Sequence, residues 1–186
     1  MPYGPVFQSI FQIRSRMPLT AGSPQPMPLT TLTVEKAFAH HKGAINAPYG
    51  NACLAAAYLF IDHWDTAHRI AQDLPTREGS YWHAIIHRRE PDYWNSKYWF
   101  RRVGEHPVYP LLVQKIQSLP LNAELEKIIQ QITQDNRWDP FAFVDACEHA
   151  PQKGEQAVSA CEMIQDLEFK VLFQYCYERA IGIEKG

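Results

Sequence analysis

Apolar side chains form one unbroken run in the chain and recur at helical spacing through most of the rest. Residues 52–61, ACLAAAYLFI, are almost wholly apolar and rich in alanine, which is typical of a central helix that packs on several sides. After a polar interruption, apolar residues return every three or four positions from Ala67 to Leu74 and stop before Pro75. The spacing predicts a second helix that folds back on the first, with a turn at 48–50 before the pair.

The same two-helix pattern recurs further along the chain. Ser80 is a suitable N-cap for a helix over 80–90, and Asp92 is a suitable N-cap for a helix over 92–103. Pro91 separates the two. The second pair follows the first at an offset of 29 residues, as the alignment of Trp64 with Tyr93 shows. The chain therefore predicts two successive helical hairpins.

Helical spacing continues to the C-terminus. The predicted helices are 111–116, 121–132, 139–149 and 155–181. Asp139 followed by proline is an N-cap with proline in the first helical position. No segment shows the strict alternation of a half-buried strand. We predict an all-α fold, a single domain of about six to eight helices in stacked antiparallel hairpins, tetratricopeptide-like or bundle-like.

The N-terminal region has a different composition. Residues 17–30 contain four prolines and no charge, which predicts an extended Pro-rich arm on the outside of the domain. Three large apolar residues precede it, Phe7, Ile10 and Phe11, and we expect them to dock on the body because exposed apolar side chains promote association. The predicted division is an arm over 1–32 and one helical domain over 33–186.

The length and the net charge of the chain limit the classes of protein to which it can belong. A chain of 186 residues fits one domain. A net charge of −2 provides no overall field that would attract nucleic acid or an anionic membrane. No apolar run approaches the roughly 20 residues that span a bilayer, and no signal peptide is recognisable. The four cysteines form no C-x-x-C pair and are expected to be reduced thiols. We expect a soluble, cytoplasmic protein.

Two resemblances can be drawn from these patterns. The predicted second hairpin is similar to a single tetratricopeptide-type repeat, with small, aromatic and turn residues near the positions of that motif: Ala84, His87, Asp92, Tyr93, Ser96, Phe100 and Pro107. Over 51–182 the chain also resembles an uncharacterised family of small bacterial all-helical proteins, through AHRIAQD, SYWHAIIHRREPDYWNSKYWFRRVGEHPV, WDPFAFVD and LFQYCY. These resemblances imply packed helix pairs and no particular activity.

One histidine pair has the spacing of a metal site. His83 and His87 lie four residues apart on a predicted helix, so both imidazoles face the same way, and Glu90 lies near that face. This spacing suits zinc, nickel or iron, with a further ligand from one of three other histidines: His63, His68 or His106. The alternative is structural, because a histidine with a satisfied hydrogen bond can simply pack against the partner helix.

Basic and aromatic residues surround this pair. Five basic residues alternate with acidic ones: Arg88, Arg89, Lys97, Arg101 and Arg102. They form either a network of salt bridges or a site for an anion beside Trp94 or Trp99. Because these tryptophans lie on different faces of one helix, we expect at least one to be buried.

The motifs of common enzymes are missing from the sequence, which has no G-x-S-x-G and no glycine-rich phosphate loop. We therefore predict a non-enzymatic helical scaffold or binding module, which holds a protein, a peptide or a small anionic ligand in a polar groove. The groove residues are His83, His87, Arg88, Glu90, Arg101, Arg102 and His106. The alternative is a metal-dependent enzyme that uses His83 and His87 as ligands, Glu90 or Asp92 as ligand or general base, and Arg101 or Arg102 to neutralise the substrate. Homo-oligomer formation stays open.

Overall fold

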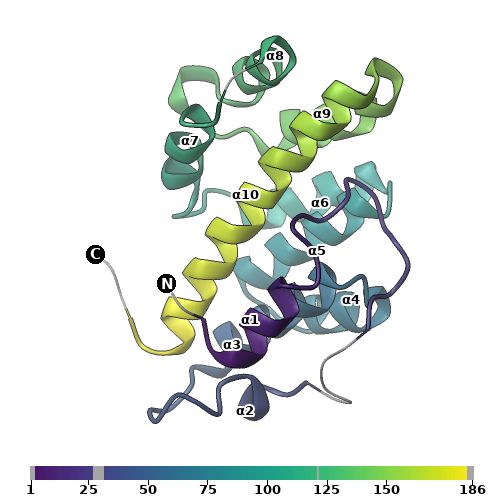
Figure 1. Cartoon of the computed structure of the whole chain (residues 1–186). Helices are drawn as coiled ribbons and strands as arrows, with labels where there is room; N and C mark the ends of the chain where they lie inside the picture. Colours follow the sequence, from purple (N-terminus) through teal and green to yellow (C-terminus); the bar gives the residue numbers. More distant parts are fainter. Residues whose placement is uncertain (1–2, 27–31, 121, 184–186) are drawn as a thin grey trace.

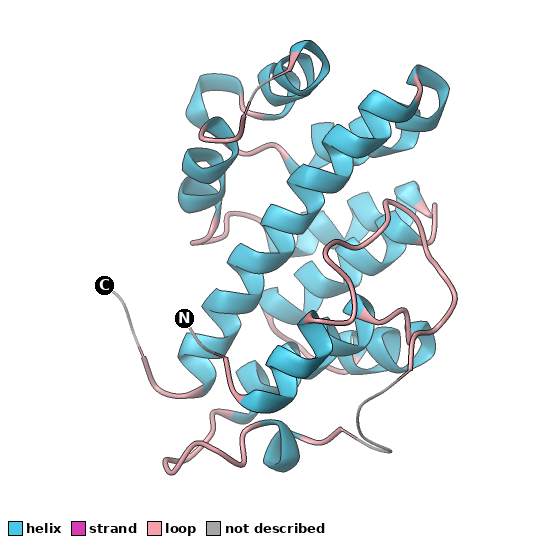
Figure 2. Ribbon diagram, in the orientation of Figure 1, coloured by secondary structure: helices cyan, strands magenta, loops and turns pink. Residues whose placement is uncertain are grey.

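The computed structural model describes residues 3–26, 32–120 and 122–183, whose arrangement is shown in Figure 1. These residues form ten α-helices and one 3-10 helix, Gln134–Asn136, with no strand among them (Figure 2). The α-helices are α1 (Pro5–Phe11), α2 (Val34–Ala37), α3 (Ala47–Phe60), α4 (Trp64–Gln72), α5 (Arg77–Arg89), α6 (Tyr93–Val103), α7 (Tyr109–Gln117), α8 (Ala123–Ile132), α9 (Pro140–Lys153) and α10 (Glu155–Ala180). The predicted all-α fold is confirmed, with more helices than expected.

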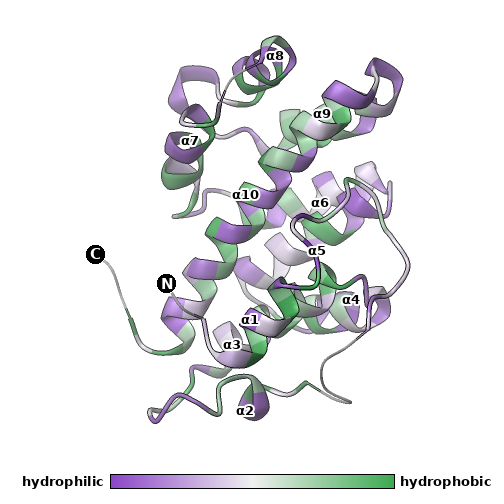
Figure 3. Ribbon diagram, in the orientation of Figure 1, coloured by the Kyte–Doolittle hydropathy of each residue, from purple (hydrophilic) through white to green (hydrophobic). Residues whose placement is uncertain are grey.

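The long helix α10 is the axis of the molecule. It contacts α3, α7, α8 and α9 and runs past all of them (Figure 1). Because neighbours surround it, buried side chains occur along its length from Ala157 to Ala180 and are not confined to one stripe. Figure 3 accordingly shows apolar and polar residues interspersed along this helix.

Helix α3 is buried along most of its length. Every residue from Ala52 to Phe60 is buried, as the apolar run predicts. The expected turn at 48–50 was wrong, because Pro48 lies in the first turn of α3, where the missing N–H of proline breaks no helical hydrogen bond. Gly50 lets the N-terminal segment approach closely, since a β-carbon there would lie 2.9 Å from Val34 Cγ1.

Two hairpins, α3–α4 and α5–α6, follow one another, and α4 packs on α5. Trp64 and Tyr93, which the 29-residue offset aligns, are the first residues of α4 and α6. Helix α5 begins at Arg77, three residues before the predicted cap at Ser80. The reason is that the Thr76 hydroxyl accepts a hydrogen bond from the backbone N–H of Gly79, which makes Thr76 the N-cap.

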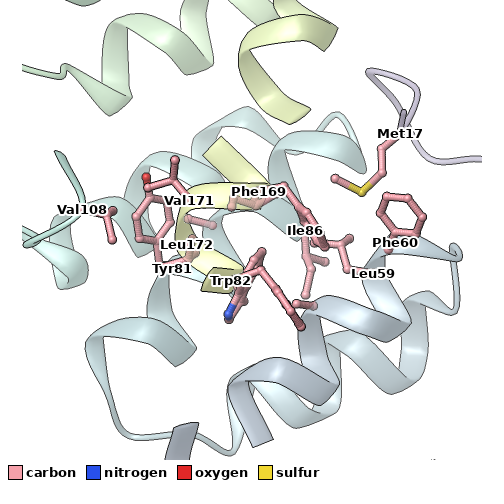
Figure 4. Close-up of a cluster of buried hydrophobic side chains, with 14 of the residues drawn as sticks. Met17, Leu59, Phe60, Tyr81, Trp82, Ile86, Val108, Phe169, Val171 and Leu172 are labelled. Carbon is pink, nitrogen blue, oxygen red and sulfur yellow. The ribbon is translucent and has the colours of Figure 1, made fainter. Parts of the chain in front are cut away.

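The N-terminal region contributes to the core. Phe7 and Ile10 on α1 are fully buried, and the ring of Phe11 packs edge-on against those of Phe60 and Phe173, at centroid distances of 5.0 and 4.7 Å. The predicted docking of Phe7, Ile10 and Phe11 is confirmed. Met17 is also buried, and Figure 4 shows it beside Phe60. The described part of the Pro-rich segment is thus partly internal. Residues 27–31 of the predicted arm lie outside the described residues, as does Leu121 of the predicted helix 121–132.

The expectation for the tryptophans of α6 was wrong. Trp94 is 72% exposed and Trp99 is half-buried. The buried face of α6 consists of smaller residues, Ser96, Phe100 and Val103, and the Ser96 hydroxyl donates to the carbonyl of Ala84 on α5. Close packing of the hairpin through Ser96 therefore leaves Trp94 exposed and Trp99 only partly buried at the edge of the core.

Within the described residues, none of the helices is both long and apolar enough to cross a membrane.

Candidate metal centre

Three histidines from two helices converge at the contact between the hairpins. α4 supplies His68, and α5 supplies His83 and His87 from successive turns. One ring nitrogen from each lies within 4.8 Å of one from each of the others. Nε2 of His83 is 2.9 Å from Nε2 of His68. The packing of α4 on α5 thus adds His68 to the pair that the sequence predicted, His83 and His87, and gives a set of three nitrogen donors.

Burial keeps two of these imidazoles neutral. His83 is 1% exposed and His87 is 8% exposed. Burial, followed by the charges of His68 and His87, lowers the pKa of His83 from 6.5 to about 3. Burial and then His68 lower the pKa of His87 as well. The neutral form that these shifts favour at pH 7 is the form that coordinates a metal.

Each buried imidazole also has an unused nitrogen. Nδ1 of His83 and Nδ1 of His87 are buried without a hydrogen-bond partner in the described part of the chain. Nδ1 of His87 lies 3.6 Å from a Glu90 carboxylate oxygen and 3.5 Å from one of Asp92. A carboxylate beside one ring nitrogen of an imidazole is the usual arrangement around a histidine that binds a metal through its other nitrogen. Glu90 therefore lies next to His87, a candidate metal ligand, and is not itself part of the histidine cluster.

The cluster opens to the surface on one side. Asp65, His68, Arg69, Gln72 and Glu90 line an open hollow of about 380 Å³ between α4 and the end of α5. His68 is only half-buried and belongs to both the cluster and the hollow. Burial raises the pKa of Glu90 and the nearby His68 opposes that change. A ligand in the hollow would meet the accessible edge of the histidine cluster together with a carboxyl group.

An aromatic ring and a cation cover the other side. Trp99 of α6 stacks on His83, with ring centroids 3.9 Å apart and planes 24° from parallel. The Arg102 guanidinium carbon lies 5.0 Å from the centroid of the Trp99 ring. The charge of Arg102 contributes to the lowered pKa of His83, after burial and the two other histidines. The half-buried Trp99 thus fixes the orientation of His83, a candidate metal ligand.

The dimensions of the cluster fit a tetrahedral ion after a small adjustment. Zinc with nitrogen ligands at about 2.0–2.1 Å holds those nitrogens about 3.3 Å apart. The 2.9 Å between His68 and His83 is close to that value. The largest separation, within 4.8 Å, would shorten by at most about 1.5 Å. Small rotations of the imidazole side chains can supply such a change.

Other residues of the predicted groove lie elsewhere. Arg88 is fully buried, pairs with Glu168 of α10 and lies 4.5 Å from the centroid of the Phe143 ring. His106 is buried, with Nε2 3.6 Å from a carboxylate oxygen of Glu78. Arg101 is exposed, and no carboxylate of the described residues lies within 4.0 Å of it. Of the predicted set, the structure therefore brings together His83, His87, Glu90 and Arg102.

The third histidine was one of three candidates in the sequence. His63 is engaged elsewhere, with Nε2 2.8 Å from the carbonyl oxygen of Gln25. His106 faces Glu78, and His68 alone joins the pair. One local feature favours His68. It lies three residues before Ala71, so the two residues are neighbours on the helix surface, and Ala71 is buried.

Comparisons with protein families, with curated proteins and with solved structures found no match to this chain. The resemblances to a tetratricopeptide-type repeat and to a bacterial helical family remain predictions.

Proposed function

We propose that the protein binds one divalent transition-metal ion, zinc in the first place, through His68, His83 and His87, and that it acts on an anionic substrate there. The observation that carries this proposal is the convergence of three imidazole nitrogens within 4.8 Å from two separate helices. Two of these imidazoles have lowered pKa values, so coordination requires no costly deprotonation at pH 7.

The donor set favours particular metals. Imidazole suits zinc, nickel, copper and iron, whereas magnesium and calcium prefer oxygen ligands. Three protein ligands that leave a fourth position open are characteristic of catalytic zinc sites and not of structural ones. Such an ion, when bound, supplies Lewis-acid chemistry and activates water at neutral pH. The open hollow beside His68 is where substrate and water would enter.

The surrounding residues supply the remaining functions. Glu90 lines the hollow and lies 3.6 Å from Nδ1 of His87, so its carboxylate can orient the imidazole and accept a proton from water in the hollow. Arg69 lines the same hollow, where its guanidinium can neutralise the charge of an anionic substrate, whereas Arg102 lies on Trp99 at the other side of the cluster. Together these groups suit metal-assisted hydrolysis.

The hypothesis of a non-enzymatic binding module uses the same histidines differently. In that case His68 and His83 share one hydrogen bond, Trp99 seals the cluster, and the three imidazoles only stabilise the contact between α4 and α5. The two functions predict opposite results for metal binding, because a structural cluster gains nothing from a metal.

Titration calorimetry of the untagged full chain with ZnCl₂ at pH 7 tests the proposal. We expect one zinc ion per chain, and at least about a tenfold loss of affinity in His68→Ala, whose half-buried side chain can be removed with little effect on folding. His87→Ala should lose zinc as well. His149→Ala is the matched control, because His149 is exposed on α9. Absence of stoichiometric zinc from the wild-type protein, or equal loss in the control, would contradict the metal centre and leave the histidines a structural role.

A further inference from the structure

A second hollow lies between α1, the end of α3 and α10. It has a volume of about 520 Å³, within the usual size of a small-molecule site. Its apolar lining consists of five aromatic rings from three separate parts of the chain: Tyr3, Phe11, Phe60, Phe169 and Phe173. Most of these ring pairs meet edge to face, for example Tyr3 and Phe173 at a centroid distance of 4.8 Å, whereas Phe169 and Phe173 are stacked. The hollow is therefore held open by side chains that pack on each other.

One end of this hollow is positively charged. Arg14 lines it and is 15% exposed. Its Nη2 lies 2.7 Å from Oδ2 of Asp62, while Oδ1 of the same carboxylate accepts a hydrogen bond at 2.9 Å from Arg89. Two guanidinium groups thus share one carboxylate. No other carboxylate of the described residues lies within 4.0 Å of either arginine.

The cluster of Arg14, Asp62 and Arg89 therefore carries one uncompensated positive charge. Asp62 is 1% exposed and Arg89 is fully buried, so water cannot screen this charge efficiently. Arg89 directs its other donors to backbone carbonyls, including those of Pro18 and Leu59. Burial, with a contribution from the charge of Arg14, lowers the pKa of Arg89 to about 10. The excess charge is accessible only through Arg14.

The other charged groups at the hollow cancel each other. Nζ of Lys170 lies 2.7 Å from Oδ2 of Asp166, one turn before it on α10. The remaining polar lining consists of uncharged glutamine and serine side chains. The guanidinium of Arg14 is therefore the one unbalanced charge at this hollow among the described residues. Its Cζ lies 5.8 Å from the centroid of the Phe60 ring, so cation and apolar lining adjoin.

We infer that this hollow binds a small amphipathic anion, an aromatic or short aliphatic carboxylate, with its apolar body against the phenylalanines and its carboxylate on Arg14. The guanidinium group donates hydrogen bonds to a carboxylate through its free edge, and the anion supplies the negative charge that the cluster lacks. The aromatic rings supply an apolar contact for the rest of the ligand. This site is separate from the histidine cluster and does not depend on metal binding.

Three probes that share the same apolar group but differ in charge test the inference. The probes are 4-phenylbutyrate, 4-phenyl-1-butanol and 4-phenylbutylamine, titrated into the full chain at pH 7 and followed by NMR. We expect 4-phenylbutyrate to bind at least about tenfold more tightly than the alcohol, since hydrogen bonds to charged groups are stronger than neutral ones. The amine should bind most weakly. The amide signals of Gln12 and Ser15, which line the hollow, should shift during the titration.

Arg14→Gln is the decisive variant. Asp62 keeps its bond to Arg89 in this variant and the cluster becomes neutral, so we expect the protein to fold and to lose its preference for the carboxylate over the alcohol. Arg16→Gln is the control, because it removes an equal charge two residues away, in a neighbouring hollow. The inference is overturned if the wild-type protein binds none of the three probes, or binds carboxylate and alcohol equally. It is also overturned if Arg16→Gln loses the preference as fully as Arg14→Gln.

Discussion

Replacing Glu168 by glutamine tests how much the interior depends on one buried ion pair. The side chains of Arg88 and Glu168 are both fully shielded from solvent. Burial alone would lower the pKa of Arg88, but the adjacent Glu168 carboxylate reverses this and raises it. Nε and Nη1 of Arg88 have no hydrogen-bond partner among the described residues. Glu168→Gln keeps the shape of the side chain and leaves Arg88 as a buried, unpaired cation.

The expected cost follows from that arrangement. Removing one partner of a buried ion pair costs about 3–5 kcal/mol. With a urea m-value of about 2 kcal/mol per molar, the midpoint of unfolding should fall by about 1.5–2.5 M. The double variant Arg88→Met, Glu168→Leu removes both charges and should recover most of the loss, because apolar side chains of similar size replace an ion pair at little cost.

Urea unfolding followed by circular dichroism measures both effects. Glu155→Gln is the control, because Glu155 is exposed at the start of α10, and its unfolding free energy should change by no more than about 0.5 kcal/mol. The reasoning is refuted if Glu168→Gln unfolds within about 1 kcal/mol of the wild-type protein, or if the double variant is as unstable as the single one.

Three further predictions concern the rest of the fold. The pKa of His83 is about 3 in the folded protein and 6.5 when unperturbed. Because the unfolded chain therefore binds one more proton than the folded protein between these pH values, the free energy of unfolding should fall by about 1–2 kcal/mol from pH 7 to pH 5. Denaturant unfolding at both pH values should show a smaller fall in His83→Gln, and an equal fall in that variant would contradict the lowered pKa. Phe7 is fully buried on α1, so Phe7→Ala should lower the free energy of chemical unfolding by about 3–5 kcal/mol, whereas Gln8→Ala should change it little. A near-neutral Phe7→Ala would show that α1 is not part of the core. Asp139 accepts hydrogen bonds from the backbone N–H groups of Phe141 and Ala142, so Asp139→Ala should lower the thermal unfolding free energy by about 1 kcal/mol, and an unchanged value would refute its role as N-cap.

Sequence periodicity predicted most of the helices because most of them have a clear local cause. The apolar run at 52–61 became the buried part of α3, and Asp139 caps α9 as expected. The predicted start of α5 failed because both Thr76 and Ser80 are capping residues, and only the fold selects between them. The prediction that Trp94 or Trp99 is buried failed because small Ser96 forms the contact between α5 and α6. Large residues at helical spacing do not identify the buried face when a smaller one allows closer packing.

The candidate site could be predicted only where its residues share a helix. His83 and His87 were identified from their spacing, whereas His68 comes from another helix and required knowledge of how α4 packs on α5. The long-range ion pairs had no local signal. Arg88 was assigned to a ligand site because its partner Glu168 lies 80 residues away on α10. Likewise, the shared carboxylate of Asp62 joins Arg14 to Arg89 only in the folded chain.

X-ray absorption spectroscopy at the zinc edge tests the central claim most directly. On the protein loaded with one equivalent of zinc, the proposed centre predicts three imidazole nitrogens at about 2.0–2.1 Å and one further oxygen ligand. The His68→Ala variant, measured under the same conditions, should lose one of the imidazole contributions. A spectrum with only oxygen ligands, or one that His68→Ala leaves unchanged, would contradict a metal centre at His68, His83 and His87.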